Sequence, residues 1–113
     1  MADPTDLDYQ QIKRTGTEVT YEAIDDANGN QFQNDGRMFL HVINATGDDG
    51  TVTIDTPNTV DGLPIGNRDV VVTDGEERMI GPFQPNIYND GNRRVQLSYD
   101  VVGEGMTIAL LRL

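Results

Sequence analysis

The segment GPFQPNIYNDG, residues 81–91, separates a series of short β-type runs from the two most apolar runs of the chain. Pro82 and Pro85 fix two φ angles and remove two backbone donors, so this segment cannot be a central β-strand. Phe83 and Tyr88 are expected to dock over the end of a core, as in compact loops held by their own side chains. We therefore predict a rigid corner at one end of a β-fold. The alternative is a loop that presents Phe83 or Tyr88 to a partner.

On both sides of this segment, apolar residues alternate with polar residues, and this period of two is typical of β-strands. Residues 94–101 alternate most clearly, and residues 106–113 are apolar on both faces, which predicts a buried last strand. Residues 37–44 are also apolar on both faces and are expected to be central. Further strands are predicted at residues 17–23, 51–55, 70–72 and 77–80. The last two of these are expected to form a hairpin through the two-residue turn Asp74-Gly75.

About seven short strands with Gly, Asn and Asp turns indicate an all-β protein, a β-sandwich or jelly-roll-like single domain. A chain of 113 residues is long enough for one domain with its own core. Residues 25–36 and 57–66 are predicted to be long irregular connections. Residues 1–14 show neither helical nor strand periodicity, so we expect an extended N-terminal arm, flexible alone or laid against a neighbour. The sandwich domain is then predicted to span residues 15–113.

The chain has a net charge of −11, with nineteen acidic and eight basic residues. Nucleic acid is not an expected partner, because phosphate binding requires clustered cations. Fourteen of the acids are Asp and only Lys13 is a lysine. Such a surface suits either concentrated salt or a colloidally stable protein from an ordinary environment. The absence of Cys excludes disulfides, and no apolar run approaches the roughly 20 residues of a membrane span. We therefore expect a soluble protein without a signal peptide or a membrane partner.

The residues that usually carry catalysis or bind metals occur without a recognisable pattern. His41 is the only histidine, and on an apolar strand it is expected to be a core or interface group with its hydrogen bonds made. Ser98 is the only serine, and no nucleophile signature surrounds it. Residues 26–30 resemble the start of a calcium loop, but Gln31 and Arg37 stand where the EF-hand pattern needs Gly and Glu. We expect no enzyme activity, no catalytic residues, no cofactor and no metal site, and leave open weak cation binding by acidic turns.

Five groups of residues follow one another in the chain: TGTE at 15–18, FLHVIN at 39–44 with TVTI at 51–54, GPFQP at 81–85 with Tyr88, VQLSY at 95–99, and IALLRL at 108–113. In this order they resemble the small head decoration, or cement, proteins of tailed viruses. The resemblance covers residues 15–113. It implies a β-sandwich or jelly-roll-like fold, no enzymatic activity, and multimers clamped over joints between capsid subunits. The acidic, Lys-poor composition would fit a virus of a halophilic host.

This resemblance leads to the hypothesis of a capsid decoration protein. It would be made in the host cytoplasm and would bind the outer surface of the virion head, on the shell of the major capsid protein. We expect a homo-oligomer, a trimer in particular, because joined copies gain avidity. The predicted partner contacts are Tyr9 and Ile12 of the arm and Phe83 and Tyr88 of the corner. One alternative is another virion β-module, from a tail, neck or fibre. The other is a small ligand-binding sandwich, which the lack of Trp disfavours.

Overall fold

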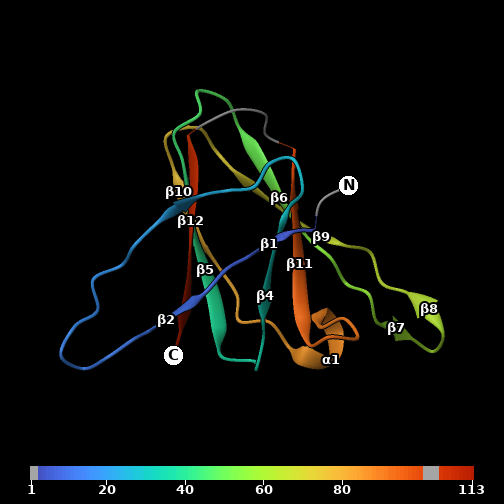
Figure 1. Ribbon diagram of the computed structural model, residues 1–113. Helices are drawn as coiled ribbons and strands as arrows, with labels where there is room; N and C mark the ends of the chain where they lie inside the picture. The colour runs from blue at the N-terminus through green and yellow to red at the C-terminus, as the bar shows by residue number, and fades with distance from the viewer. Residues whose placement is uncertain (1–2, 101–104) are drawn as a thin grey trace.

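Two β-sheets face each other and form a sandwich (Figure 1). The structure is a computed structural model and describes residues 3–100 and 105–113. Of these residues, 46% lie in strands and 4% in a helix, so the predicted all-β class is confirmed. The elements are β1 (Thr5–Asp6), β2 (Tyr9–Gln11), β3 (Glu22–Ala23), β4 (Asn30–Gln33), β5 (Met38–Asn44), β6 (Gly50–Ile54), β7 (Thr59–Val60), β8 (Leu63–Pro64), β9 (Arg68–Val72), β10 (Glu77–Ile80), α1 (Pro85–Tyr88), β11 (Arg94–Tyr99) and β12 (Met106–Arg112).

The strand pairing shows which kind of sandwich this is. Sheet A has the order β1-β4-β11-β6-β9, and sheet B has the order β10-β5-β12-β2, with β3 also paired to β12. Four antiparallel pairs are nested in the sequence: β3 with β12, β4 with β11, β5 with β10, and β6 with β9. These pairs lie alternately in sheet B and sheet A. A long hairpin rolled up in this way over one core is an eight-stranded jelly roll, so the predicted jelly-roll-like fold is confirmed.

The turn at Asp74-Gly75 does not close the hairpin that we predicted. Residues 70–72 belong to β9, which pairs with β6 in sheet A, whereas residues 77–80 form β10, which pairs with β5 in sheet B. Asp74-Gly75 reverses the direction of the chain, but this turn does not determine which strand β10 pairs with. Here the chain crosses between the sheets. The buried Asn44 amide of β5 stabilises this crossing by donating to the Val72 carbonyl oxygen at 2.8 Å.

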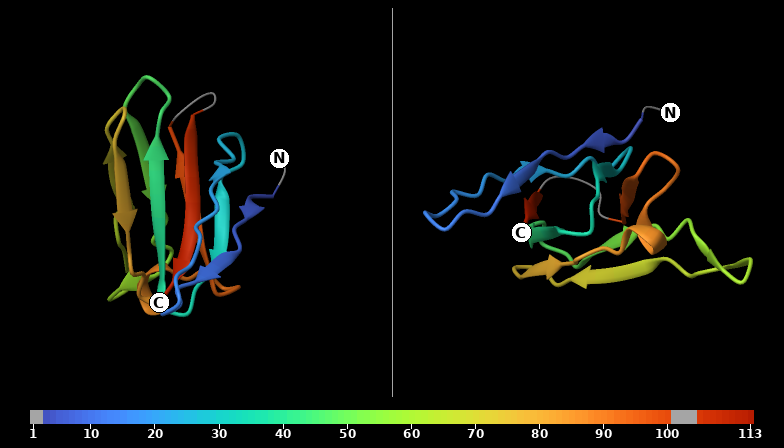
Figure 2. Two further views of the ribbon diagram at one scale, coloured as in Figure 1. Left: turned by 90° about the vertical axis from the view of Figure 1, so that its left-hand side faces the viewer. Right: turned by 90° about the horizontal axis from the view of Figure 1, so that it is seen from below.

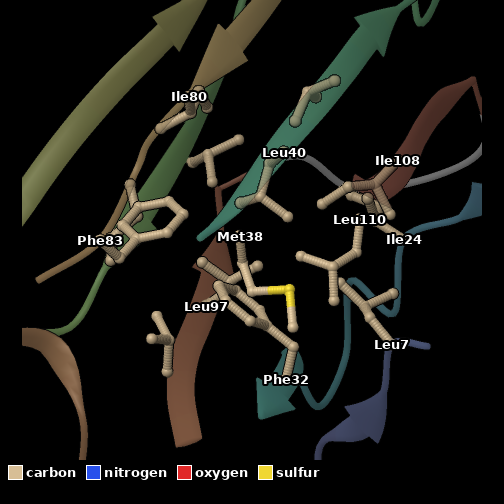
Figure 3. Close-up of a cluster of buried hydrophobic side chains, with 14 of the residues drawn as sticks. Leu7, Ile24, Phe32, Met38, Leu40, Ile80, Phe83, Leu97, Ile108 and Leu110 are labelled. Atoms are coloured by element: carbon tan, nitrogen blue, oxygen red, sulfur yellow. The ribbon is translucent and has the colours of Figure 1, made fainter. Parts of the chain in front are cut away.

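The core lies between the two sheets and is built from the inward faces of the long strands (Figure 3). In β5, Met38, Leu40 and Val42 are buried and alternate with half-buried residues. Full burial of each such side chain contributes roughly 1.5–3 kcal/mol. As predicted, β5 is central and β12 is integrated into the core, with β5 on one side of β12 and β2 and β3 on the other. The predicted alternation after residue 93 is confirmed over β11, while residue 101 lies outside the described residues.

Strand β4 falls inside residues 25–36, which we predicted to be an irregular polar connection. Phe32 is its only large apolar residue, and the Asn30 side chain beside it is fully buried. Asn30 is tolerated there because its side chain accepts from the Tyr99 hydroxyl at 2.7 Å and donates to the Thr5 carbonyl at 3.2 Å. Burial, and then the charges of nearby carboxylates, raises the pKa of Tyr99, which keeps this hydroxyl a donor.

Two other predicted segments also differ from the structure. Residues 57–66 contain the hairpin of β7 and β8 in place of an irregular connection. Residues 17–23 contain only the two-residue strand β3 in place of a full half-buried strand. Tyr21 lies inward there because its hydroxyl forms a hydrogen bond with His41 Nδ1 at 2.6 Å, and not because it belongs to a strand.

The N-terminal segment, which we expected to be flexible alone or laid against a neighbour, lies instead against its own domain. Strand β1 pairs parallel with β4 of sheet A, and β2 pairs parallel with β12 of sheet B. Leu7, between these strands, is only 5% exposed and packs beside Ile24 and Leu110 (Figure 3). The segment thus runs across one edge of both sheets (Figure 2). The other edges, β9 and β10, have no further strand partner among the described residues.

Candidate functional site

The corner at residues 81–91 closes one end of the core. The Phe83 side chain is 2% exposed, and its ring centroid lies 5.6 Å from that of Phe32 and 5.4 Å from that of Tyr88. The predicted corner over one end of the core is therefore observed. The prediction that Phe83 contacts a partner is wrong, because its ring is buried between the two sheets.

Tyr88 and the two predicted arm contacts occupy separate places. Tyr88 is half-buried, packs against the core, and its hydroxyl accepts from Arg68 Nε at 3.1 Å. Tyr9 and Ile12 are both exposed on the N-terminal segment. The structure therefore does not bring the four predicted residues into one site. Instead, it groups Tyr9 with charged residues that the sequence analysis did not select.

Tyr9 lies on a hollow of about 370 Å³ together with Asp35, Arg93 and Arg112, and we call this surface the arginine hollow. These residues come from β2, the turn before β5, the turn before β11, and the end of β12. They meet because all four positions fall at the same end of the sandwich. No local sequence signal connects them.

Arg112 organises the floor of the arginine hollow. Its Nε donates to Asp35 Oδ2 at 2.8 Å, and its Nη1 donates to Gln11 Oε1 at 2.9 Å. The guanidinium carbon also lies 5.8 Å from the centroid of the Tyr9 ring, a cation–π distance. The hydrogen bond from Arg112, followed by the backbone N–H of Arg37, lowers the pKa of Asp35 below its ordinary value. Arg112 therefore holds Tyr9 in place and is largely neutralised by its own neighbours.

Arg93 is the residue of the hollow with a guanidinium left to bind a partner. Its backbone has a φ of 62°, in the left-handed region that non-glycine residues rarely adopt. The turn is held by Asp90, whose Oδ1 accepts from the N–H groups of Asn92 at 2.8 Å and Arg94 at 3.0 Å. Within residues 3–100 and 105–113, the Arg93 side chain is exposed and makes no hydrogen bond or ion pair. A guanidinium in this position suits a carboxylate, which it can bind through two parallel hydrogen bonds.

The two ends of the sandwich differ in charge. Around the arginine hollow lie four arginines and four aspartates, namely Arg37, Arg93, Arg94, Arg112, Asp6, Asp8, Asp35 and Asp90, and Asp6 Oδ1 lies 3.7 Å from Arg94 Nε. The turns at the other end carry Asp25, Asp26, Asp48, Asp49, Asp74, Glu76 and Asp100. We call these the arginine end and the acidic end. They lie at the bottom and the top of Figure 1, respectively. The acidic excess therefore gathers at one end of the strands, which favours one orientation on a charged surface.

Of the other residues that we considered for chemistry, His41 is explained by its neighbours. Its Nδ1 meets the Tyr21 hydroxyl and its Nε2 lies 3.2 Å from Glu77 Oε1, so both ring nitrogens have partners, as predicted. Across the described residues there is no group of three or more acidic or histidine side chains that could hold a metal ion. The helix found in this part of the chain has four residues, and no helix there could cross a membrane.

Comparison of the chain with protein-family models, with curated proteins and with solved structures finds no match. The resemblance to head decoration proteins therefore stays a prediction.

Proposed function

We propose that the protein is a capsid decoration protein that binds the outer surface of an assembled virion head and stabilises joints between capsid subunits. The observation that carries this proposal is the arginine end. There, the Arg93 guanidinium has no partner among the described residues and lines the same hollow as the exposed Tyr9, on a molecule with a net charge of −11. The jelly roll supports the proposal only by analogy, because this fold serves viral capsid domains and also lectins.

The charge distribution gives the proposal an orientation. A strongly acidic protein is repelled by packaged nucleic acid, so its place on a virion is the outer surface. The arginine end faces the shell and meets carboxylates there, while the acidic end faces the solvent. Complementary charges of this kind set orientation and association rate more than affinity. The remaining affinity comes from avidity, because several copies are joined in a homo-oligomer, which we expect to be a trimer.

The contact residues are revised accordingly. Tyr9 and Ile12 remain proposed contacts because they are exposed near the arginine end, and Arg93 joins them. Tyr88 remains a proposed contact at its exposed part only. Phe83 is withdrawn because it is buried. The same surface could serve a tail, neck or fibre module, and the experiment below separates the two readings.

The test is to mix the purified protein with undecorated shells, sediment them in native salt, and then challenge the decorated shells with heat or low salt. We expect the wild type to co-sediment and to increase shell survival. Arg93→Glu should bind about 10- to 100-fold more weakly, because it loses a charge-assisted hydrogen bond. The matched control is Arg78→Glu, the same charge change away from the arginine end, which should bind as the wild type does.

Two outcomes would contradict the proposal. If the wild type does not co-sediment, or binds without any gain in shell survival, the tail-module reading becomes the better one. If Arg78→Glu weakens binding as much as Arg93→Glu, net charge and not the arginine hollow accounts for binding.

A further inference from the structure

The segment between β6 and β9 projects from the body of the sandwich as a two-stranded hairpin of β7 and β8 (Figures 1 and 2). Its turn residues Asp61 and Gly62 have φ values of 53° and 74°, the two left-handed positions of a type I′ turn. Val60 and Leu63 flank the turn as a directly opposed pair, so their side chains lie on the same face of the hairpin. They are 63% and 67% exposed. We call this pair the hairpin knob.

The hairpin is anchored at its base, so the knob has a defined position. The buried Thr56 hydroxyl donates to the Ile65 carbonyl at 2.9 Å, and the Thr56 N–H donates to Asn67 Oδ1 at 3.1 Å. A two-stranded ribbon on its own is marginally stable in water, and in this one the opposed apolar pair Val60 and Leu63 stays exposed. The hairpin therefore presents two adjacent aliphatic side chains at a fixed place, where they could enter a recess on another molecule.

An apolar hollow lies on the opposite side of the molecule, at the outer face of sheet B. It has a volume of about 250 Å³ and is lined by Phe39, Met79, Ile80, Gly81, Pro82 and Leu113. Met79 and Leu113 are 66% and 56% exposed. Phe39 and Met79 point outward because the residues that alternate with them, such as Leu40 and Ile80, face the core. We call this surface the sheet-B hollow.

We propose that the hairpin knob of one copy of this chain docks into the sheet-B hollow of the next copy. The two surfaces are both apolar, and one projects where the other is recessed. Their surroundings are also complementary in charge. Asp61 at the tip of the hairpin has no ion pair among the described residues, and Arg37 lies beside the hollow, where its carbonyl accepts from the Leu113 N–H at 3.0 Å.

The position of the two surfaces determines the kind of assembly. The hairpin projects between β6 and β9 of sheet A (Figure 2), whereas the hollow is lined by residues of β5 and β10 in sheet B, so each copy offers a different surface to each neighbour. Such a contact is head-to-tail, and it gives a finite oligomer only when it closes into a ring. This inference rests on the proposed self-association and names its contact. It does not depend on binding to a shell.

The experiment measures self-association by sedimentation velocity over a concentration series in native salt. We expect the wild type to form oligomers. Val60→Ser with Leu63→Ser, and separately Met79→Ser, should raise the dissociation constant at least about 100-fold, since each removes apolar area from the contact. Val71→Ser is the matched control, because Val71 is exposed on β9 outside both surfaces, and it should assemble as the wild type does. If Met79→Ser lowers the unfolding midpoint, Leu113→Ser replaces it.

The most specific test is to mix the knob variant, Val60→Ser with Leu63→Ser, with the hollow variant, Met79→Ser. The knob variant keeps an intact hollow and the hollow variant keeps an intact knob. An equal mixture should therefore form a one-to-one heterodimer and nothing larger. A monomeric wild type, a knob variant that assembles normally, or a mixture that stays monomeric would each overturn the inference. Shell binding is measured separately by co-sedimentation. If the inference is overturned but the wild type still binds shells, the proposed function stands and only this contact is wrong.

Discussion

The corner at residues 81–91 and the hairpin at residues 57–66 look alike in the sequence and behave in opposite ways. Both are connections between strands, and both contain two prolines, an Asp-Gly pair and several large apolar residues. In the corner, the Phe83 ring is 2% exposed, whereas in the hairpin Val60 and Leu63 remain mostly exposed. Apolar content alone therefore does not tell whether a connection completes the core or presents a surface to a partner.

The difference follows from where each connection lies. The corner crosses the open end between the sheets, and Asn34 and Asn89 join it to the end of β4. Asn34 Nδ2 donates to the Phe83 carbonyl at 3.0 Å, and Asn89 Nδ2 donates to the Asn34 carbonyl at 3.1 Å. The hairpin extends beyond the sheet, where no part of the described chain covers its knob. We therefore expect mutations in the corner to act on stability and mutations in the knob to act on association.

The largest effect is expected for Phe83→Ala. Removing a buried aromatic ring from a packed core should lower the free energy of unfolding by about 3–5 kcal/mol. Urea denaturation followed by circular dichroism measures this loss, with Val71→Ala as an exposed control. A loss below about 1 kcal/mol would mean that the corner does not close the core.

A somewhat smaller effect is expected for Leu7→Ala, which extends the comparison to the N-terminal segment. Leu7 is the apolar anchor of that segment in the core, so its truncation should cost about 2–4 kcal/mol. Limited proteolysis should then cut the variant within residues 1–14 much faster than it cuts the wild type. Equally fast cleavage of both proteins would show that the segment is already detached, as an independent arm would be.

Asp90→Asn should weaken the corner by about 1 kcal/mol near neutral pH, because Asp90 accepts three hydrogen bonds there. Burial alone would raise the pKa of Asp90, but the N–H groups of Arg94 and Asn92 and the Gln96 amide lower it overall. Because the pKa of Asp90 is lower in the folded state than in the unfolded state, its carboxylate stabilises the fold at pH values above the unfolded-state pKa of about 3.9. This contribution is lost as the pH falls through the folded value. The gap between wild type and variant should therefore close below about pH 4, and a gap that widens there would contradict the assignment.

The smallest effect on stability is expected for the knob variant. Val60→Ser with Leu63→Ser should change the free energy of unfolding of the monomer by no more than about 0.5 kcal/mol, as for other exposed positions. Thermal unfolding at a concentration below assembly measures it. A loss above about 2 kcal/mol would place these side chains in the core, and the contrast with the corner would disappear.

The parts of the fold that could be predicted from sequence depend on neighbouring residues. The alternation over residues 94–99 and the apolar run at 106–112 determine strands locally, and Pro82 and Pro85 mark the corner. Strand β4 was missed because its buried Asn30 depends on partners 25 and 69 residues away. The hairpin was also missed, although its two-residue Asp-Gly turn was a usable signal.

The candidate site was less accessible to sequence analysis. The sequence indicated Tyr9 as an exposed contact, but the arginine hollow joins it to Arg93 and Arg112 from segments far along the chain. Only the rolled-up topology brings these segments to one end. The sequence carried a weak sign of this arrangement, since residues 92–113 have a net charge of +1 and residues 1–91 have −12.

Imaging of decorated particles would test the central claim most directly. The protein should be added to undecorated shells and its density located and oriented by averaging. The account predicts density on the outer surface of the head, with the arginine end toward the shell and the acidic end toward solvent. Density on a tail or neck, or on the head with the acidic end toward the shell, would contradict it.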